Sequence, residues 1–150
     1  MTTMPLAQVK ALLLVASHLS GYPIPAGMDP PAVFLVSPRE MAIEACGGDS
    51  LLGCEVIGFY EYPDSGHERI MVDANEAQAE HSASAIAVHE LTHWLQYHNW
   101  LNPADQSCPR EFLREYEAYL AGYRYEVIYE RAKAPASFSL PGLECQFTVK

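Results

Sequence analysis

The chain has 150 residues, of which 49% are hydrophobic and 19% are charged, and this composition excludes an intrinsically disordered protein. Its net charge of −10 argues against a nucleic acid partner, because binding a polyphosphate needs a basic surface. No apolar run approaches the roughly 18 residues that span a bilayer, so we expect no membrane insertion. We expect a monomer with a single domain over residues 1–150, long enough to bury about two-thirds of its extended surface.

The first predicted element is a helix near the N-terminus. Apolar residues recur at helical spacing from Leu6 to Ala16, and Pro5 stands at the start of the run, a position that proline favours. A proline-rich loop ends this helix. Residues 32–36 are then predicted to form a buried strand, because they are apolar, partly β-branched and bounded by prolines.

A capping box predicts where the second helix begins. Ser37 fits the N-cap, Pro38 the first helical position and Glu40 the third, so that the Ser37 and Glu40 side chains can bond each other's backbone N–H groups. We expect this short helix to end at Gly47.

The rest of the chain alternates between strands and helices. Residues 55–62 and 68–73 are predicted to pair as a hairpin. Helices are predicted over residues 82–98 and from about 109 to 131, and residues 135–150 form a tail or a strand. The expected fold is therefore α+β, with a small three- or four-stranded sheet packed against two long helices.

Four cysteines allow three full pairings. Cys46 and Cys54 bracket a short glycine-rich loop, and a disulfide between them would stabilise the fold by roughly 2–3 kcal/mol. The pairing of Cys108 and Cys145 stays open. A periplasmic or secreted location is expected if the cysteines pair, and a cytoplasmic one if they are buried thiols, which the absence of a recognisable signal peptide favours.

The most specific motif lies in the helix over residues 82–98. His89-Glu90-Leu91-Thr92-His93 is an H-E-x-x-H sequence. Residues four apart share one face of a helix, so His89 and His93 can bind one metal ion, expected to be Zn²⁺, while Glu90 points toward a metal-bound water. The alternative is a pair of hydrogen-bonded histidines on a buried helix. The opposite side of this helix is apolar and would face the core: Val88, Leu91 and Leu95.

A catalytic zinc site needs a third protein ligand, and we predict Glu117. A helical wheel places Glu117 on the aliphatic side of the last long helix and Glu115 on the opposite, solvent side. An inward carboxylate needs a cationic partner, because burying it unpaired is costly. A salt bridge with Arg114 or Arg124 is the alternative to metal binding. The wheel is oriented by four aliphatic residues: Leu113, Leu120, Ala121 and Ile128.

The H-E-x-x-H motif, followed 24 positions after His93 by Glu117-Ala118, resembles the gluzincin pattern of zinc metallopeptidases. In that pattern a Glu-Ala pair on a second helix supplies the third ligand. The order of helix, sheet, metal helix and ligand helix also resembles a group of small bacterial zincin-like proteins of minimal size. Gluzincins often carry an acidic residue four positions after the ligand Glu, oriented to a zinc-bound histidine, but this chain has Ala121 there.

The resemblance implies a minimal zincin-like fold and a zinc metallopeptidase that cleaves a peptide or protein substrate. Glu90 would act as general base on the zinc-activated water and then pass the proton to the leaving amine. An extended peptide is expected to align with the strand at residues 70–73 by edge addition. Four side chains are candidate donors to the oxyanion of the transition state: Tyr97, Tyr119, Tyr123 and Arg124.

Two other functions stay open. The chain could be a zinc-stabilised interaction or regulatory module with little or no turnover. It could also be a zinc amidohydrolase that acts on a non-protein amide, which would use the same metal chemistry on a different substrate.

Overall fold

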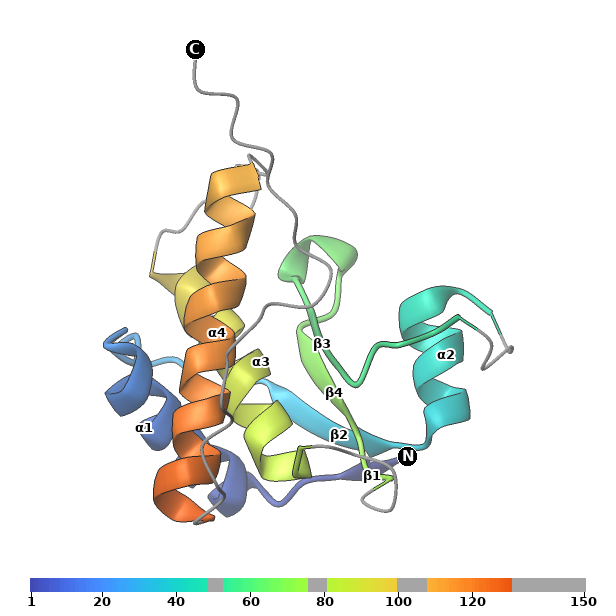
Figure 1. Ribbon diagram of the computed structural model, residues 1–150, viewed down its shortest axis with the longest axis horizontal. Helices are drawn as coiled ribbons and strands as arrows, with labels where there is room; N and C mark the ends of the chain where they lie inside the picture. The colour runs from blue at the N-terminus through green and yellow to red at the C-terminus, as the bar shows by residue number, and fades with distance from the viewer. Residues whose placement is uncertain (49–52, 76–80, 100–107, 131–150) are drawn as a thin grey trace.

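The computed structural model describes residues 1–48, 53–75, 81–99 and 108–130. Within these ranges the chain has the predicted α+β fold, with four helices, one short 3-10 helix and one four-stranded mixed sheet (Figure 1). The elements in chain order are β1 (Thr2–Thr3), α1 (Leu6–Ser20), β2 (Ala32–Val36), α2 (Pro38–Cys46), β3 (Gly58–Glu61), η1 (Pro63–Ser65), β4 (Arg69–Asp73), α3 (Ala83–His98) and α4 (Cys108–Tyr129).

The strand order in the sheet is β1-β2-β4-β3. β2 and β4 are parallel, and the other two pairs are antiparallel. The prediction that residues 70–73 form an edge for an added peptide is wrong, because β4 has a hydrogen-bonded neighbour on each side. The edge strand next to β4 is β3. It is shorter than predicted, since its register places Ile57 opposite Asp73, where β4 ends.

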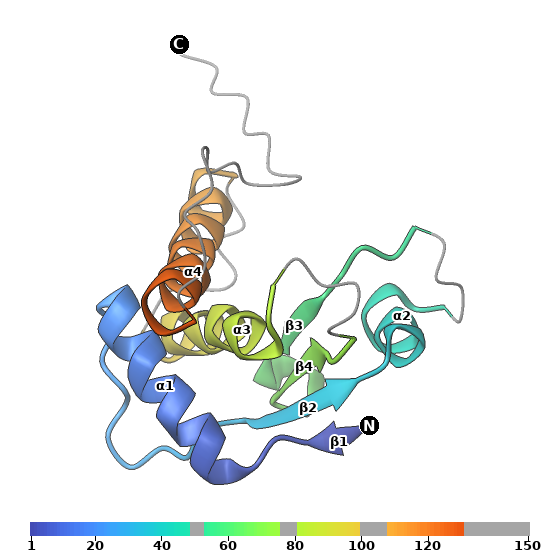
Figure 2. The same ribbon diagram turned by 60° about the horizontal axis from the view of Figure 1, so that its bottom comes forward.

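The two faces of the sheet bury different clusters, as the alternation of side chains along a strand requires. Val33, Ile70 and Val72 face the larger cluster, which also contains residues of α1, α3 and α4. Val36 and Met71 face a smaller cluster with α2. In Figure 2, α2 lies apart from α1, α3 and α4, so the sheet separates it from the other three helices.

The predicted signals at the ends of α1 and α2 are confirmed. Pro5 precedes α1, and both hydrogen bonds of the capping box join Ser37 and Glu40 at the start of α2. α2 ends at Gly47, whose φ of 70° is in the left-handed region that glycine adopts readily. Ser82 caps α3 by accepting a hydrogen bond from the backbone N–H of Ala85.

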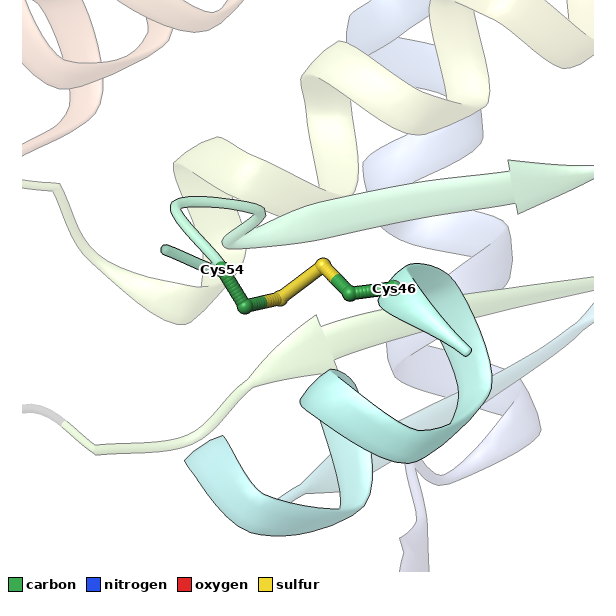
Figure 3. Close-up of a disulfide and its surroundings, with 2 residues drawn as sticks. All are labelled: Cys46 and Cys54. Atoms are coloured by element: carbon green, nitrogen blue, oxygen red, sulfur yellow. A yellow bond between two sulfur atoms is a disulfide. The ribbon is translucent and has the colours of Figure 1, made fainter. Parts of the chain in front are cut away.

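The disulfide Cys46–Cys54 is present as predicted (Figure 3). It ties the end of α2 to the segment that leads into β3. Residues 135–150, and with them Cys145, lie outside the described residues, as does the side chain of Cys108. Among the helices of the described ranges, none is both long and apolar enough to cross a membrane.

α3 runs through the middle of the helical layer, and α4 crosses it (Figure 1). Residues 85–88 and 90–96 of α3 are all buried, so the helix is enclosed on almost every side. α4 meets α3 through small buried residues, among them Ala118, Ala121 and Gly122. A Cβ atom on Gly122 would lie 3.2 Å from the carbonyl oxygen of Ala85. The two helices therefore approach closely at this point.

Candidate metal centre

His89 and His93 lie one turn apart on α3 and turn their imidazole rings toward each other. Their ring centroids are 4.9 Å apart, and the two Nε2 atoms are 3.2 Å apart. His93 is only 8% exposed. The spacing of four residues thus gives the convergence that the motif predicts.

Glu115 of α4 completes this group. Its Oε1 lies 3.1 Å from Nε2 of His93, and its Oε2 lies 3.4 Å from Nε2 of His89. Among the described residues, His89, His93 and Glu115 form the one group of three or more side chains whose ligand atoms converge closely enough to hold a metal ion.

The predicted orientation of α4 is therefore wrong, because Glu115 and not Glu117 lies against the histidines. The wheel placed the large aliphatic residues inward, but Leu113 and Ile128 are 49% and 58% exposed. The face that packs on α3 instead carries small residues, which let the two backbones come close. Glu115 shares this face with Ala118 and Gly122, three and seven positions further along the helix.

The separations within the group fit a metal ion. Ligand atoms about 2.0–2.2 Å from a tetrahedral zinc ion lie roughly 3.3–3.5 Å from one another. Here the two Nε2 atoms lie 3.2 Å apart, Oε1 of Glu115 lies 3.1 Å from His93 and Oε2 lies 3.4 Å from His89. With one ligand atom from each residue, all three atoms lie within 4.8 Å of one another, so side-chain adjustment can bring them around one ion. Two imidazoles and a carboxylate suit zinc and other divalent transition metals.

The charges in the site support each other. Burial opposes protonation of His93, but the hydrogen bond to Glu115 and the negative charge of that carboxylate outweigh it and raise the pKa of His93 to about 8. Burial also disfavours the Glu115 carboxylate, yet hydrogen bonds to His89 and His93 hold the pKa of Glu115 well below its usual value. Glu115 is thus an anion at neutral pH, as a metal ligand must be.

Glu90 lies beside the two histidines, with Oε1 4.0 Å from Nε2 of His89. It is 6% exposed, and burial raises the pKa of its carboxyl group above the usual range. The backbone N–H of Tyr60 on β3 hydrogen-bonds this carboxylate. The edge strand and the candidate general base are therefore in direct contact.

Of the four predicted oxyanion donors, Tyr119 lies against the metal group, with its ring centroid 4.5 Å from that of His89. Tyr97 instead packs with Tyr60 and Tyr62. The other two donors lie further along α4: Tyr123 is half-buried one turn beyond Tyr119, and Arg124 donates to the carbonyl oxygen of Leu19 at the end of α1.

Tyr62 was missed in the sequence. Burial is the main cause of its raised pKa, to which the carboxylates of Glu115 and Glu90 add. Burial and the same two carboxylates raise the pKa of Tyr119. Both phenols therefore lie in the field of the site. The sequence alone could not assign Tyr62 to the site, because it does not show that the strand before Tyr62 lies beside the helix of the H-E-x-x-H motif.

Glu117 takes part in a different set of contacts. Its Oε2 accepts a hydrogen bond of 2.6 Å from the hydroxyl of Tyr22 and one of 3.0 Å from the amide of Gln96. Gln96 in turn lies 2.9 Å from Nδ1 of His93. Sequence reasoning missed Gln96 and Tyr22. Of the two, only Gln96 could have been found from the sequence, because it follows His93 by three positions and so lies on the same side of the helix.

Comparisons of the chain with protein-family models, with curated proteins and with solved structures found no significant match to any of the three.

Proposed function

We propose that the protein is a zinc-dependent hydrolase, and specifically a metallopeptidase of the gluzincin-like type. The observation that carries the proposal is the position of Glu90, a buried carboxylate 4.0 Å from a ligand atom of the group formed by His89, His93 and Glu115. Three protein ligands leave a fourth position open on a tetrahedral ion, as in catalytic rather than structural zinc sites. The H-E-x-x-H motif gives Glu90 the same role.

A zinc ion in this site would act as a Lewis acid on a carbonyl group and lower the pKa of a bound water. Glu90 accepts the proton of the attacking water and returns it to the leaving amine. Burial raises the pKa of Glu90, and this makes it a stronger base than a carboxylate in water. The Tyr60 N–H fixes the orientation of the carboxylate.

Tyr119 and Tyr62 are the proposed donors to the developing oxyanion. Any phenol is protonated at neutral pH and has a hydrogen to donate, and the carboxylates of Glu90 and Glu115 act on both of these tyrosines. Tyr119 has the stronger support, because its ring also lies against His89. Of the residues singled out in the sequence for this role, Tyr119 is thus retained.

The edge strand β3 is the proposed place for an extended substrate. Asp73 donates its backbone N–H to Ile57, so the alternation of antiparallel pairs turns the backbones of Phe59 and Glu61 toward β4. Gly58 and Tyr60 then turn their backbone groups outward, on the side of Glu90. A peptide that pairs with β3 would bring its backbone close to the candidate base.

The disulfide Cys46–Cys54 supports a periplasmic or secreted location, because disulfides persist mainly in oxidising compartments. A redox titration in a glutathione buffer tests this inference. A bond that stays oxidised at cytosolic potentials would leave the cytoplasm open as the location.

The experiment for the function combines metal analysis with a cleavage screen. Wild-type protein should bind one zinc ion per chain and cleave members of a broad peptide library. Glu90→Gln should keep the zinc and lose about 100- to 10,000-fold in turnover, the usual contribution of a general base. Zinc binding without cleavage by the wild type would favour the interaction module, and cleavage of only non-protein amides would favour the amidohydrolase.

A further inference from the structure

The amide of Gln96 has only one orientation that satisfies its neighbours. Its Nε2 lies 3.0 Å from the backbone carbonyl oxygen of Arg114 and 3.0 Å from Oε2 of Glu117. A carbonyl and a carboxylate can only accept hydrogen bonds. The NH₂ group must therefore face α4.

This orientation determines the hydrogen on His93. Oε1 of Gln96 lies 2.9 Å from Nδ1 of His93, and an amide oxygen only accepts. Nδ1 must then carry the hydrogen. In the cationic ring Nε2 also carries a hydrogen and donates it to Glu115. Once the ring is neutral and Nδ1–H is kept by Gln96, the lone pair is left on Nε2, the atom that faces Glu115 and His89.

We propose that Tyr22, Glu117 and Gln96 form a positioning relay that fixes the tautomer and the ring orientation of His93. The inference rests on the proposed metal site, which gives the tautomer its purpose, because only an unprotonated Nε2 can bind a metal ion. Glu117 is in this account a positioning residue that acts through Gln96. Gln96, whose side chain is 1% exposed, lies between Glu117 and His93.

The outer end of the relay is anchored in another part of the fold. Tyr22 follows α1, and its hydroxyl donates 2.6 Å to the same Glu117 oxygen that Gln96 uses. Burial, followed by the hydrogen bond to Glu117, raises the pKa of Tyr22, so the phenol remains a donor. The Glu117 carboxylate on α4 thus fixes the Gln96 amide, and Tyr22, in the segment after α1, fixes the carboxylate.

The first test reads the tautomer directly, without metal. The ¹⁵N shifts of the imidazole in the metal-free protein, recorded at a pH at which the ring is neutral, should show His93 protonated at Nδ1. Gln96→Leu keeps a side chain of similar size but removes the acceptor, so a large fraction of the ring should change to the Nε2–H tautomer. An unchanged tautomer in a folded Gln96→Leu variant would overturn the relay.

The second test separates a ligand from a positioning residue through zinc affinity, measured by competition with a chelator. Glu117→Gln keeps an oxygen for Tyr22 and Gln96, and its affinity should stay within about threefold of wild type. Gln96→Leu should lose about 10- to 100-fold, the usual effect of removing the group that orients a ligand histidine. Glu115→Gln should lose more than either.

The outcomes distinguish the inference from the function on which it rests. A loss in Glu117→Gln as large as that in Glu115→Gln would make Glu117 a ligand and overturn the relay. Wild-type protein that binds no zinc would overturn the proposed function, while the ¹⁵N measurement would still decide whether Gln96 controls His93. Glu117→Gln is the milder change, so its zinc affinity can still be compared with that of Glu115→Gln if Gln96→Leu does not fold.

Discussion

A Cβ atom built on Gly58 would lie 2.5 Å from Oε1 of Glu90 and 2.6 Å from Cγ2 of Ile86. No real Cβ atom tolerates such contacts, so the backbone of β3 and the side chain of Glu90 can take up their positions only if residue 58 has no side chain. The glycine is thus required by the close approach of the edge strand to α3.

Gly58→Ala should displace either β3 or the Glu90 carboxylate. We expect a cost of about 1–3 kcal/mol in the free energy of unfolding, as for other overpacked sites, and a loss of hydrolysis with zinc affinity nearly unchanged. Thermal melts, chelator competition and the cleavage assay measure the three quantities. Gly48→Ala is the matched control, because a Cβ there meets nothing within 4 Å. Equal effects at both positions would argue against the contact.

Gly122 sets the distance between α3 and α4, and therefore the position of Glu115. Gly122→Ala places a Cβ 3.2 Å from the Ala85 carbonyl, and this tight contact is offset by the roughly 1 kcal/mol of helix propensity that alanine gains. Gly122→Leu must push the helices apart and should weaken zinc binding at least about tenfold. Leu113→Ala, at an exposed position of the same helix, is the control. Zinc affinity that Gly122→Leu leaves intact would contradict this account.

Zinc binding should depend on pH through His93. Its pKa in the folded, metal-free protein is raised to about 8, so below that pH zinc must displace a proton, and its affinity should rise about tenfold per pH unit up to pH 8. The stability of the metal-free protein should change with pH in the opposite direction. The stabilisation from His93 is fully present below the unfolded pKa of about 6.5 and is lost as the pH rises through 8.

Melting curves with and without zinc, at several values between pH 6 and pH 9, measure both effects. The increase in Tm on adding zinc should be larger at pH 9 than at pH 6. Glu115→Gln removes the carboxylate that raises the pKa of His93, so its metal-free Tm should lose most of this pH dependence. A zinc-induced increase that is the same at every pH would show that His93 does not titrate on binding.

Reduction of Cys46–Cys54 should lower stability without affecting the metal. A loop this short is worth roughly 2–3 kcal/mol in the chain-entropy model, which corresponds to a decrease in Tm of about 5–10 °C for a chain of this size. The double variant Cys46→Ser/Cys54→Ser should match the reduced protein. Zinc affinity should not change, because α2 packs on the opposite face of the sheet from α3 and α4. A decrease in affinity would instead connect the disulfide to the site through β3.

Local patterns in the sequence predicted what local chemistry determines. The capping box of Ser37 and Glu40 forms because its two hydrogen bonds join residues three apart, and His89 meets His93 because one helical turn separates them. β1 could not be predicted in this way. It has two threonines, Thr2 and Thr3, and becomes a strand only by pairing with β2.

The third member of the site depends on tertiary packing. A wheel shows which residues share a face of α4, but the face that turns inward is decided by what α3 presents. Large aliphatic residues suggested one face, whereas the close approach of Gly122 to Ala85 required the other. The same change of face moved Glu117 from the expected ligand position to the contacts with Tyr22 and Gln96.

The enclosure of α3 has a consequence for how an ion would enter and leave. Residues 85–88 and 90–96 are buried, so their amide hydrogens should be among the slowest to exchange with deuterated solvent, at rates set by global unfolding. The backbone positions of His89 and His93 are therefore fixed relative to each other. The Glu115 side chain is 34% exposed, and rotation of this one carboxylate is the motion by which we expect the ion to be released.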